Sequence, residues 1–394
     1  MHRPTRRELL AGSLAALGLA GRVDSLWASR VDTSPLEPYP KGRFLGVVPF
    51  DPLPKPPNLG VTEGKGITAR RLLDLSSLTE ATRITPADQY YIRTGVPITL
   101  PDTASWRLAL RTRKAAATEL SLATLSEMAE PMGVHFCESA DNGAEVAFGM
   151  LSAAEWTGVP LTKVLAQGGG LPEGAWRVLV EGYDRHAEPI PDLRQGAGWI
   201  LSAEELAQSG AFLALTMNGA PLSSDHGHPL RLVVPGWYGC AWIKWVHSVV
   251  VTPDDTFATP HMQEYAKRTF QAGVPRRANR FAPAVVDAAA MPIRIEKWRW
   301  AGEIEYRIVG VRWGGGNPGD EVSIRFAPDQ EWKPVSSFVP PASTATWSFW
   351  SHRWWPAQPG RYTLEMAVGN SRIRTRRLAE GHYNRQVTLT SIDA

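Results

Sequence analysis

Three side chains that can carry positive charge lie close together in the sequence, among glycines. They are His226, Arg231 and Lys244, and the segment between them contains glycines at 227, 236 and 239. Glycine lets the backbone approach a ligand closely, and cations around such a backbone can bind a phosphate group. The pattern therefore indicates an anion site. The spacing is equally compatible with a loop histidine and two solvated strand residues.

The chain contains two cysteines, Cys137 and Cys240. They can form a disulfide only if the fold brings their Cα atoms within about 7 Å of one another. An unpaired thiol is a liability in an exported protein, so each cysteine needs a reason to be present. A disulfide and two free thiols both remain open on this evidence.

The residues around these candidates predict a mixed domain of helices and strands from residue 36 to residue 272. Its strand-like runs lie at 106–112, 176–182, 230–235 and 243–252, and its helical stretches lie at 121–129 and 202–209. Ser202 and Glu205 have the spacing of a capping box at the start of the second helix. We therefore expect an α+β fold for this half.

The pattern from residue 290 to residue 394 is wholly that of strands. Runs of alternating hydrophobic residues lie at 293–300, 305–313, 321–326, 346–350, 362–368 and 386–390. Short strands at this spacing, with glycine and proline in the turns, predict a β-sandwich. The loose stretch at 272–291 then separates two domains.

Composition and charge exclude several classes of protein. The 42 basic and 39 acidic side chains give a formal net charge of +3, which is too small to favour nucleic acid or an anionic membrane surface. Sixteen tryptophans and 32 prolines in 394 residues fit extended segments and β-structure better than a helix bundle. The sequence contains no Cys-x-x-Cys-His haem attachment motif.

The first thirty residues have the form of an export signal. Arg6 and Arg7 precede a mild apolar run at 11–20, which is too short to span a bilayer as an independent helix. Paired arginines before such a run are typical of twin-arginine signals. We expect residues 1–30 to be a signal peptide, the mature protein to be periplasmic, and no membrane span to remain after signal removal.

Several short motifs follow one another in a fixed order along most of the chain. They are Tyr-Tyr-Ile-Arg at 90–93, Trp-Thr-Gly at 156–158, Gly-Tyr-Asp at 182–184, Asn-Gly at 218–219, Asp-His-Gly at 225–227, Pro-Leu-Arg at 229–231, Pro-Gly at 235–236 and Lys-Trp at 244–245. This order resembles the sulfite oxidase family of molybdopterin-dependent oxidoreductases. The resemblance implies a sulfite-oxidase-type mixed α/β molybdopterin domain, followed by an immunoglobulin-like β-sandwich that forms a homodimer.

The resemblance also implies a bound molybdenum-molybdopterin cofactor. Its phosphate is expected to contact His226, Arg231 and Lys244, and Trp156 and Asp184 complete the expected cofactor-binding set.

Cys137 falls, within the same resemblance, at the position of the single protein ligand to molybdenum. A thiolate is a soft ligand that suits a redox-active metal already held by a dithiolene. The alternative for Cys137 is a buried structural cysteine. Cys240 matches no ligand of the family, and we expect it to be a small strand residue.

Catalytic roles are implied for Tyr265 and Arg93. A phenol at the position of Tyr265 can donate a hydrogen bond to a reacting oxygen, and a packing tyrosine is the alternative. Sulfite-oxidising members have further substrate arginines where this chain has Asn142 and Glu380, so we expect sulfite to be a poor substrate. The segment 137–143 also lacks the usual cysteine-x-glycine-asparagine form and carries two acids.

These implications together predict a periplasmic molybdenum oxidoreductase. It would transfer an oxygen atom at a small sulfur-containing substrate and pass electrons to a separate acceptor such as a cytochrome c. The alternative is a metal-free exported binding protein that keeps the fold and has lost catalysis. The molybdenum content of the purified protein separates the two hypotheses.

Overall fold

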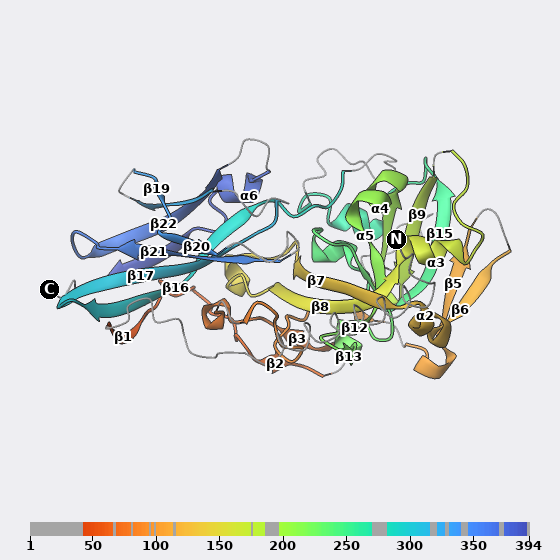
Figure 1. Ribbon diagram of the computed structural model, residues 1–394, viewed down its shortest axis with the longest axis horizontal. Helices are drawn as coiled ribbons and strands as arrows, with labels where there is room; N and C mark the ends of the chain where they lie inside the picture. The colour runs from red at the N-terminus through yellow and green to blue at the C-terminus, as the bar shows by residue number, and fades with distance from the viewer. Residues whose placement is uncertain are drawn as a thin grey trace, which may run out of the picture.

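The computed structural model describes most of the chain as two bodies that lie along the long axis of the molecule (Figure 1). The expected export signal and residues 270–281 of the stretch between the domains lie outside the described residues. Among the residues that are described, no helix is long and apolar enough to cross a membrane. The described ranges are 42–65, 68–79, 82–93, 96–97, 100–112, 116–174, 176–185, 197–269, 282–315, 321–327, 331–339, 346–369 and 374–391.

The larger body contains two five-stranded sheets. The first has the order β11-β9-β15-β5-β6, in which only β15 and β5 are parallel. Its buried face is rich in valine and leucine, as β-branched and aliphatic side chains suit a pleated surface. The strands are β5 (Arg107–Arg111), β6 (Thr118–Ser121), β9 (Trp176–Gly182), β11 (Ala197–Ser202) and β15 (Val246–Pro253).

The second sheet has the order β13-β12-β8-β7, and β14 pairs with β12. Its central strand, β8, is buried along nearly its whole length, and a bulge interrupts β7 between Pro131 and Gly133. The strands are β7 (Glu130–Glu138), β8 (Leu151–Pro160), β12 (Phe212–Met217), β13 (Ala220–Pro221) and β14 (Arg231–Val233). The ends of β7 and β14 supply residues to the site described below.

Short helices connect these strands. Helix α4 begins with the predicted capping box, in which the Ser202 hydroxyl accepts from the Glu205 amide at 3.1 Å and the Glu205 carboxylate accepts from the Ser202 amide at 2.7 Å. The helices of this body are α2 (Leu122–Met128), α3 (Leu161–Ala166), α4 (Ala203–Ser209) and α5 (Pro260–Glu264). The smaller pairs are β2 (Thr62–Glu63) with β3 (Arg70–Arg71), and β4 (Val96–Pro97) with β10 (Asp184–Arg185). The mixed α+β class is therefore confirmed.

The second body is a β-sandwich of a five-stranded and a four-stranded sheet, with orders β1-β16-β17-β21-β20 and β19-β18-β22-β23. Phe326 of one sheet stacks on Trp354 of the other at 4.7 Å, and Tyr362 meets the same indole edge-on at 5.1 Å. The elements are β1 (Arg43–Val48), β16 (Ala289–Trp300), β17 (Glu303–Trp313), β18 (Glu321–Ala327), β19 (Lys333–Pro334), β20 (Ser337–Val339), β21 (Ser348–Trp354), β22 (Gly360–Gly369), α6 (Arg376–Ala379) and β23 (Arg385–Leu389).

Strand β1 belongs to the sandwich and not to the larger body. Strand β1 pairs with β16, so the sandwich is built from both ends of the described chain. From the sequence we assigned residues 36–272 to the catalytic domain, and so did not predict that β1 belongs to the sandwich.

The two bodies meet at a buried carboxylate at the end of β7. Glu138 accepts hydrogen bonds from the Trp313 indole at 2.8 Å and the Tyr383 hydroxyl at 3.0 Å, both from the sandwich. The Asn142 amide donates to the same carboxylate at 3.2 Å. Arg377 of α6 donates to the Ala140 carbonyl at 2.7 Å. The sandwich therefore holds the loop that follows β7 in place, and that loop lines the site.

Candidate cofactor pocket and active site

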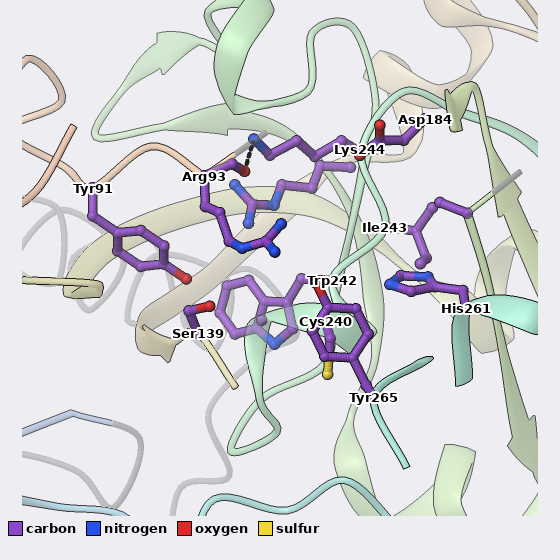
Figure 2. A pocket seen from close by; sticks show the side chains of 13 residues that line it. Tyr91, Arg93, Ser139, Asp184, Cys240, Trp242, Ile243, Lys244, His261 and Tyr265 are labelled. Atoms are coloured by element: carbon purple, nitrogen blue, oxygen red, sulfur yellow. Dashed lines mark hydrogen bonds between the residues drawn. The ribbon is translucent and has the colours of Figure 1, made fainter. Parts of the chain in front are cut away.

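A pocket opens in the larger body where the loop after β7 meets the turn between β14 and β15 (Figure 2). The wall that carries cations comes from β14 and from Lys244, two residues before β15 begins. The opposite wall comes from the loop after β7 and from the end of α5. The lining residues are Tyr91, Arg93, Ser139, Asp184, Ala197, Arg231, Gly239, Cys240, Trp242, Ile243, Lys244, His261 and Tyr265.

Arg231 lies on the cationic wall with little access to solvent. Its guanidinium lies 5.7 Å from the Trp156 ring and 5.6 Å from the Trp242 ring, and it donates to the His226 carbonyl at 3.3 Å. Among the described residues its buried Nε finds no acceptor, and neither does the Trp156 indole nitrogen. Buried donors without acceptors are costly. The Arg231 donor fits an anionic ligand that brings its own oxygens.

Lys244 lies beside Arg231 and is almost fully buried. Its ammonium donates to the Arg93 carbonyl at 2.9 Å and to the Asp225 carbonyl (Figure 2). Burial, followed by the charge of Arg231, lowers the Lys244 pKa to about 7. An anion bound here would restore the charge, because opposite charge favours the protonated amine. Asp184 lines the same wall.

His226 and Trp156 lie behind this wall and do not line the pocket. The His226 ring meets Tyr90 edge-on at 5.2 Å, and Nε2 lies 3.4 Å from the Ala87 carbonyl. Burial and the charge of Lys244 lower the His226 pKa to about 3, so the imidazole is neutral at neutral pH. In the described structure, His226 positions Arg231 through its carbonyl. Of the five cofactor residues expected from sequence, Arg231, Lys244 and Asp184 are the ones that face the cavity.

Both expected catalytic residues, Tyr265 and Arg93, line the pocket. The Arg93 guanidinium lies 6.0 Å from the centroid of the Tyr265 ring. Burial raises the pKa of the Tyr265 phenol above its usual value, and the charge of Arg93 opposes this shift. The phenol is therefore a hydrogen-bond donor at neutral pH.

A carboxylate neutralises part of the positive charge at this end of the pocket. Asp141 pairs with Arg93 at 2.7 Å and with Arg268 at 2.8 Å. From the sequence we expected Asn142 and Glu380 to lower the positive charge around the substrate. The structure corrects this expectation, because neither residue lines the pocket. Asn142 is buried and bonds to Glu138 and to the Met150 amide, whereas Glu380 is exposed at the end of α6. Neither lines the pocket.

The two cysteines are unpaired and occupy different positions relative to the pocket. Cys137 is fully buried, with its sulfur 3.1 Å from the Tyr91 hydroxyl. Gly239 packs against it so closely that a Cβ on this glycine would lie 3.0 Å from the sulfur. Cys137, expected as the metal ligand, therefore does not line the pocket, whereas Ser139 and Cys240 do. Cys240 lies in a short 3-10 helix (Gly239–Ala241) and not in a strand.

The asparagine at 142 is the signal that could have found Ser139 from sequence. When Asn142 is matched to the asparagine of the cysteine-x-glycine-asparagine form, the cysteine position falls on Ser139 and the glycine position on Asp141. No comparable signal in the sequence points to Cys240.

Comparisons with known proteins identify similar sequences and a similar fold. Residues 94–259 match the family described as the oxidoreductase molybdopterin binding domain. Sulfite oxidase of Gallus gallus is 27% identical over 344 residues, which cover 81% of this chain and 72% of that protein. Mitochondrial sulfite oxidase of Macaca fascicularis is 34% identical over 181 residues, which cover 44% of this chain and 32% of that protein.

A solved structure shows the same fold. The sulfane dehydrogenase SoxCD from Paracoccus pantotrophus superposes with a TM-score of 0.60 at 19% sequence identity, over 93% of this chain and 97% of that one. The segment matched to the Macaca fascicularis enzyme spans about a third of that relative's length. The chain is therefore similar to the sulfite oxidase family of molybdopterin-dependent oxidoreductases, and the matched molybdopterin binding domain lies at residues 94–259.

Proposed function

We propose that this protein is a molybdenum enzyme that transfers an oxygen atom at a small sulfur-containing substrate. The observation that carries the proposal is a single pocket with two unlike ends. One end is lined by the buried cations Arg231 and Lys244, and the other by Tyr265 and Arg93. The first suits a phosphate-bearing cofactor, and the second suits a substrate oxygen.

The cationic wall would hold the molybdenum-molybdopterin cofactor. Arg231 and Lys244 are the residues whose donors suit its phosphate, and Asp184 offers a carboxylate to pterin N–H groups. When bound, the cofactor would supply two-electron redox chemistry for oxygen-atom transfer. The buried Nε of Arg231 supports this assignment, because an anionic, hydrogen-bonding ligand in the pocket would satisfy it.

The other end of the pocket would act on the substrate. Tyr265 keeps its phenolic proton, so it can donate a hydrogen bond to a reacting oxygen and hold it in place. Arg93 can orient an acceptor oxygen of the substrate. Because Asp141 pairs with Arg93 and also with Arg268, less positive charge is left for the substrate than two arginines would provide.

This charge balance favours a substrate of low charge. A sulfite dianion would compete with the Asp141 carboxylate for Arg93, whereas a neutral or singly charged sulfur compound would not. We therefore keep the proposal that the protein prefers a substrate of low charge over sulfite. Its cause is Asp141, and not Asn142 and Glu380 as expected from the sequence.

Steady-state kinetics of the molybdenum-loaded protein test this function. With an artificial electron acceptor, we expect turnover of neutral sulfur compounds and a high KM for sulfite. A loaded protein that oxidises or reduces no sulfur compound contradicts the proposed reaction. A folded protein that cannot take up molybdenum supports the metal-free binding protein instead.

We further propose that electrons leave for a separate acceptor such as a cytochrome c, because the sequence contains no Cys-x-x-Cys-His motif. Substrate-dependent reduction of added cytochrome c tests this directly. An enzyme that turns over only with small-molecule acceptors would contradict it.

Export to the periplasm by the twin-arginine pathway remains a proposal supported by Arg6 and Arg7 before their apolar run. Replacement of both arginines by lysine should leave folded protein in the cytoplasm. Undiminished periplasmic protein in this variant would exclude the twin-arginine route.

A homodimer formed through the sandwich is proposed on the resemblance and on the frequency of two-fold assemblies. Light scattering at micromolar concentration should give twice the mass of the chain. A monomer under the same conditions would contradict the assembly.

A further inference from the structure

We propose that Tyr91 is a positioning residue for the sulfur of Cys137, and that its hydroxyl tunes the metal to which this sulfur is expected to bind. The inference rests on the proposed function, since it concerns the cofactor of the same pocket. The observation that carries it is the contact between the Tyr91 oxygen and the Cys137 sulfur at 3.1 Å.

The Cys137 sulfur touches two residues that line the pocket. It lies 3.1 Å from the Tyr91 hydroxyl, and a Cβ built on Gly239 would lie 3.0 Å from it. Tyr91 and Gly239 are both lining residues, whereas the side chain of Cys137 has no exposed surface. The Tyr91 phenol is therefore in contact with the pocket and with the sulfur at once.

The backbone holds the Tyr91 ring in a fixed direction relative to the sulfur. The Tyr91 amide donates to the Ser152 hydroxyl at 3.0 Å, and Ser152 is the residue of β8 that pairs with Cys137 of β7. The Tyr90 ring stacks on the Tyr91 ring at 5.4 Å, with 18° between the two planes. One strand pair therefore anchors both partners of the contact, so little side-chain freedom remains to be lost.

The contact also depends on the glycine at 239. A Cβ at this position would lie 2.8 Å from the Tyr91 oxygen and 3.0 Å from the Cys137 sulfur. Any larger residue would push the phenol or the sulfur away, because atoms do not pack so closely. Gly239 thus permits a close approach that the phenol and the sulfur share.

The direction of this hydrogen bond follows from the chemistry of the thiol. A thiol gives up its proton when it binds a metal, so the sulfur can then only accept. The Tyr91 O–H group must therefore be the donor. A hydrogen bond to a metal-bound sulfur draws electron density from it, and this favours the reduced state of the metal.

A potentiometric titration of the molybdenum-loaded protein tests this inference. Tyr91→Phe removes the hydroxyl and keeps the ring. We expect its molybdenum to become harder to reduce, by roughly tenfold in the equilibrium for one-electron reduction, which corresponds to about 59 mV. Tyr183→Phe is the control, since Tyr183 packs against Trp106 at 5.3 Å and does not line the pocket. A Tyr91→Phe protein with the potential of the wild type overturns the inference.

A second measurement separates the hydrogen bond from the packing of the ring. Site-specific incorporation of 3-fluorotyrosine at position 91 keeps the ring and makes its hydroxyl a stronger donor. The reduction potential should then rise, opposite to the change in Tyr91→Phe. A fall in potential, or no change, would show that Tyr91 acts through its shape alone and would overturn the proposed role of the hydroxyl.

X-ray absorption at the molybdenum edge establishes whether Tyr91 acts on a bound sulfur. We expect Cys137→Ser to lose one sulfur neighbour of molybdenum and Tyr91→Phe to keep the sulfur count of the wild type. An unchanged count in Cys137→Ser overturns the inference, because Tyr91 then touches no ligand of the metal. A protein that shows the predicted shifts in potential but turns over no sulfur compound contradicts the proposed reaction and leaves the role of Tyr91 supported.

Discussion

The segment 225–245 and the segment 137–142 line the same pocket, but they relate to the sequence in opposite ways. In the first, spacing alone indicates an anion site, and the structure brings Arg231 and Lys244 to one buried wall. In the second, the most conspicuous residue, Cys137, is closed off from the cavity, and Ser139 faces it instead. Residue type predicted which side chains line the pocket in the first segment and did not predict it in the second.

The difference has a physical cause. Lysine and arginine have long side chains that can reach a cavity from many backbone positions. A cluster of these residues near glycines therefore predicts an anion site even when the exact backbone geometry is unknown. A cysteine side chain is short, so its role depends on the direction of a single Cα–Cβ bond. The Cys137 sulfur lies against the Tyr91 hydroxyl and Gly239, and Cys137 does not line the pocket. The following predictions test this contrast, beginning with the largest effect.

Tyr265→Phe should lower kcat by roughly 100- to 10,000-fold, the range for loss of a positioned proton donor. The reason is that the phenol lies at the substrate end of the pocket and stays protonated. Steady-state kinetics with measured cofactor content give the answer. Tyr183→Phe is the control, since Tyr183 packs against Trp106 and does not line the pocket. Full turnover in Tyr265→Phe would place the reacting end elsewhere.

Arg231→Met should weaken cofactor retention by roughly 10- to 100-fold, because a charge-assisted hydrogen bond contributes about 1.5 to 3 kcal/mol. Molybdenum and pterin remaining after dialysis against buffer measure the loss. The matched control is Arg385→Met in the sandwich, where the guanidinium lies over the Phe50 ring at 4.2 Å. Equal retention in the two variants would mean that the cationic wall does not hold the cofactor.

Asp141→Asn and Arg93→Gln should move the KM for sulfite in opposite directions, each by about tenfold. The first removes the carboxylate that competes for Arg93, so KM falls, and the second removes the cation, so KM rises. The KM of a neutral sulfur compound should change little in either variant. A rise in the sulfite KM of Asp141→Asn would show that this carboxylate organises the pocket for anions.

His226 should make the cofactor-free protein less stable in acid. Its pKa is lowered to about 3, so below its ordinary value near 6.5 the unfolded chain binds a proton that the folded chain does not. Stability then falls by about 1.4 kcal/mol per pH unit between pH 6.5 and pH 3.

Denaturant unfolding across this pH range should show a shallower acid slope in His226→Asn. His352 of the sandwich, with a pKa lowered to about 4, is the comparison, because its contribution stops near pH 4. An unchanged slope in His226→Asn would mean that the imidazole is already solvated in the folded protein.

Local sequence patterns predicted helices and strands well where residue type and residue spacing indicated the same secondary structure. The capping box at Ser202 and the strands of the sandwich follow their patterns closely. Strands β7 and β8 were not predicted, because Pro131 and Gly133 interrupt the first, and the second mixes small and polar residues without a regular alternation. Burial between neighbouring strands overrides such weak propensities.

Long-range contacts were beyond the reach of sequence reasoning. Glu138 gives no sign in the sequence that its carboxylate joins the two bodies through Trp313 and Tyr383. The pairing of β1 with β16 is equally invisible, because the two strands are far apart in the chain. The cationic wall of the pocket was therefore predictable from the sequence, whereas the positions of the two cysteines relative to the pocket were not.

Molybdenum and pterin analysis of the purified wild-type protein, produced in a host that makes the cofactor, tests the central claim most directly. We predict that molybdenum and pterin are present in equal amounts and match the amount of folded chain. A folded protein that contains neither would contradict the assignment of this pocket to a molybdopterin cofactor.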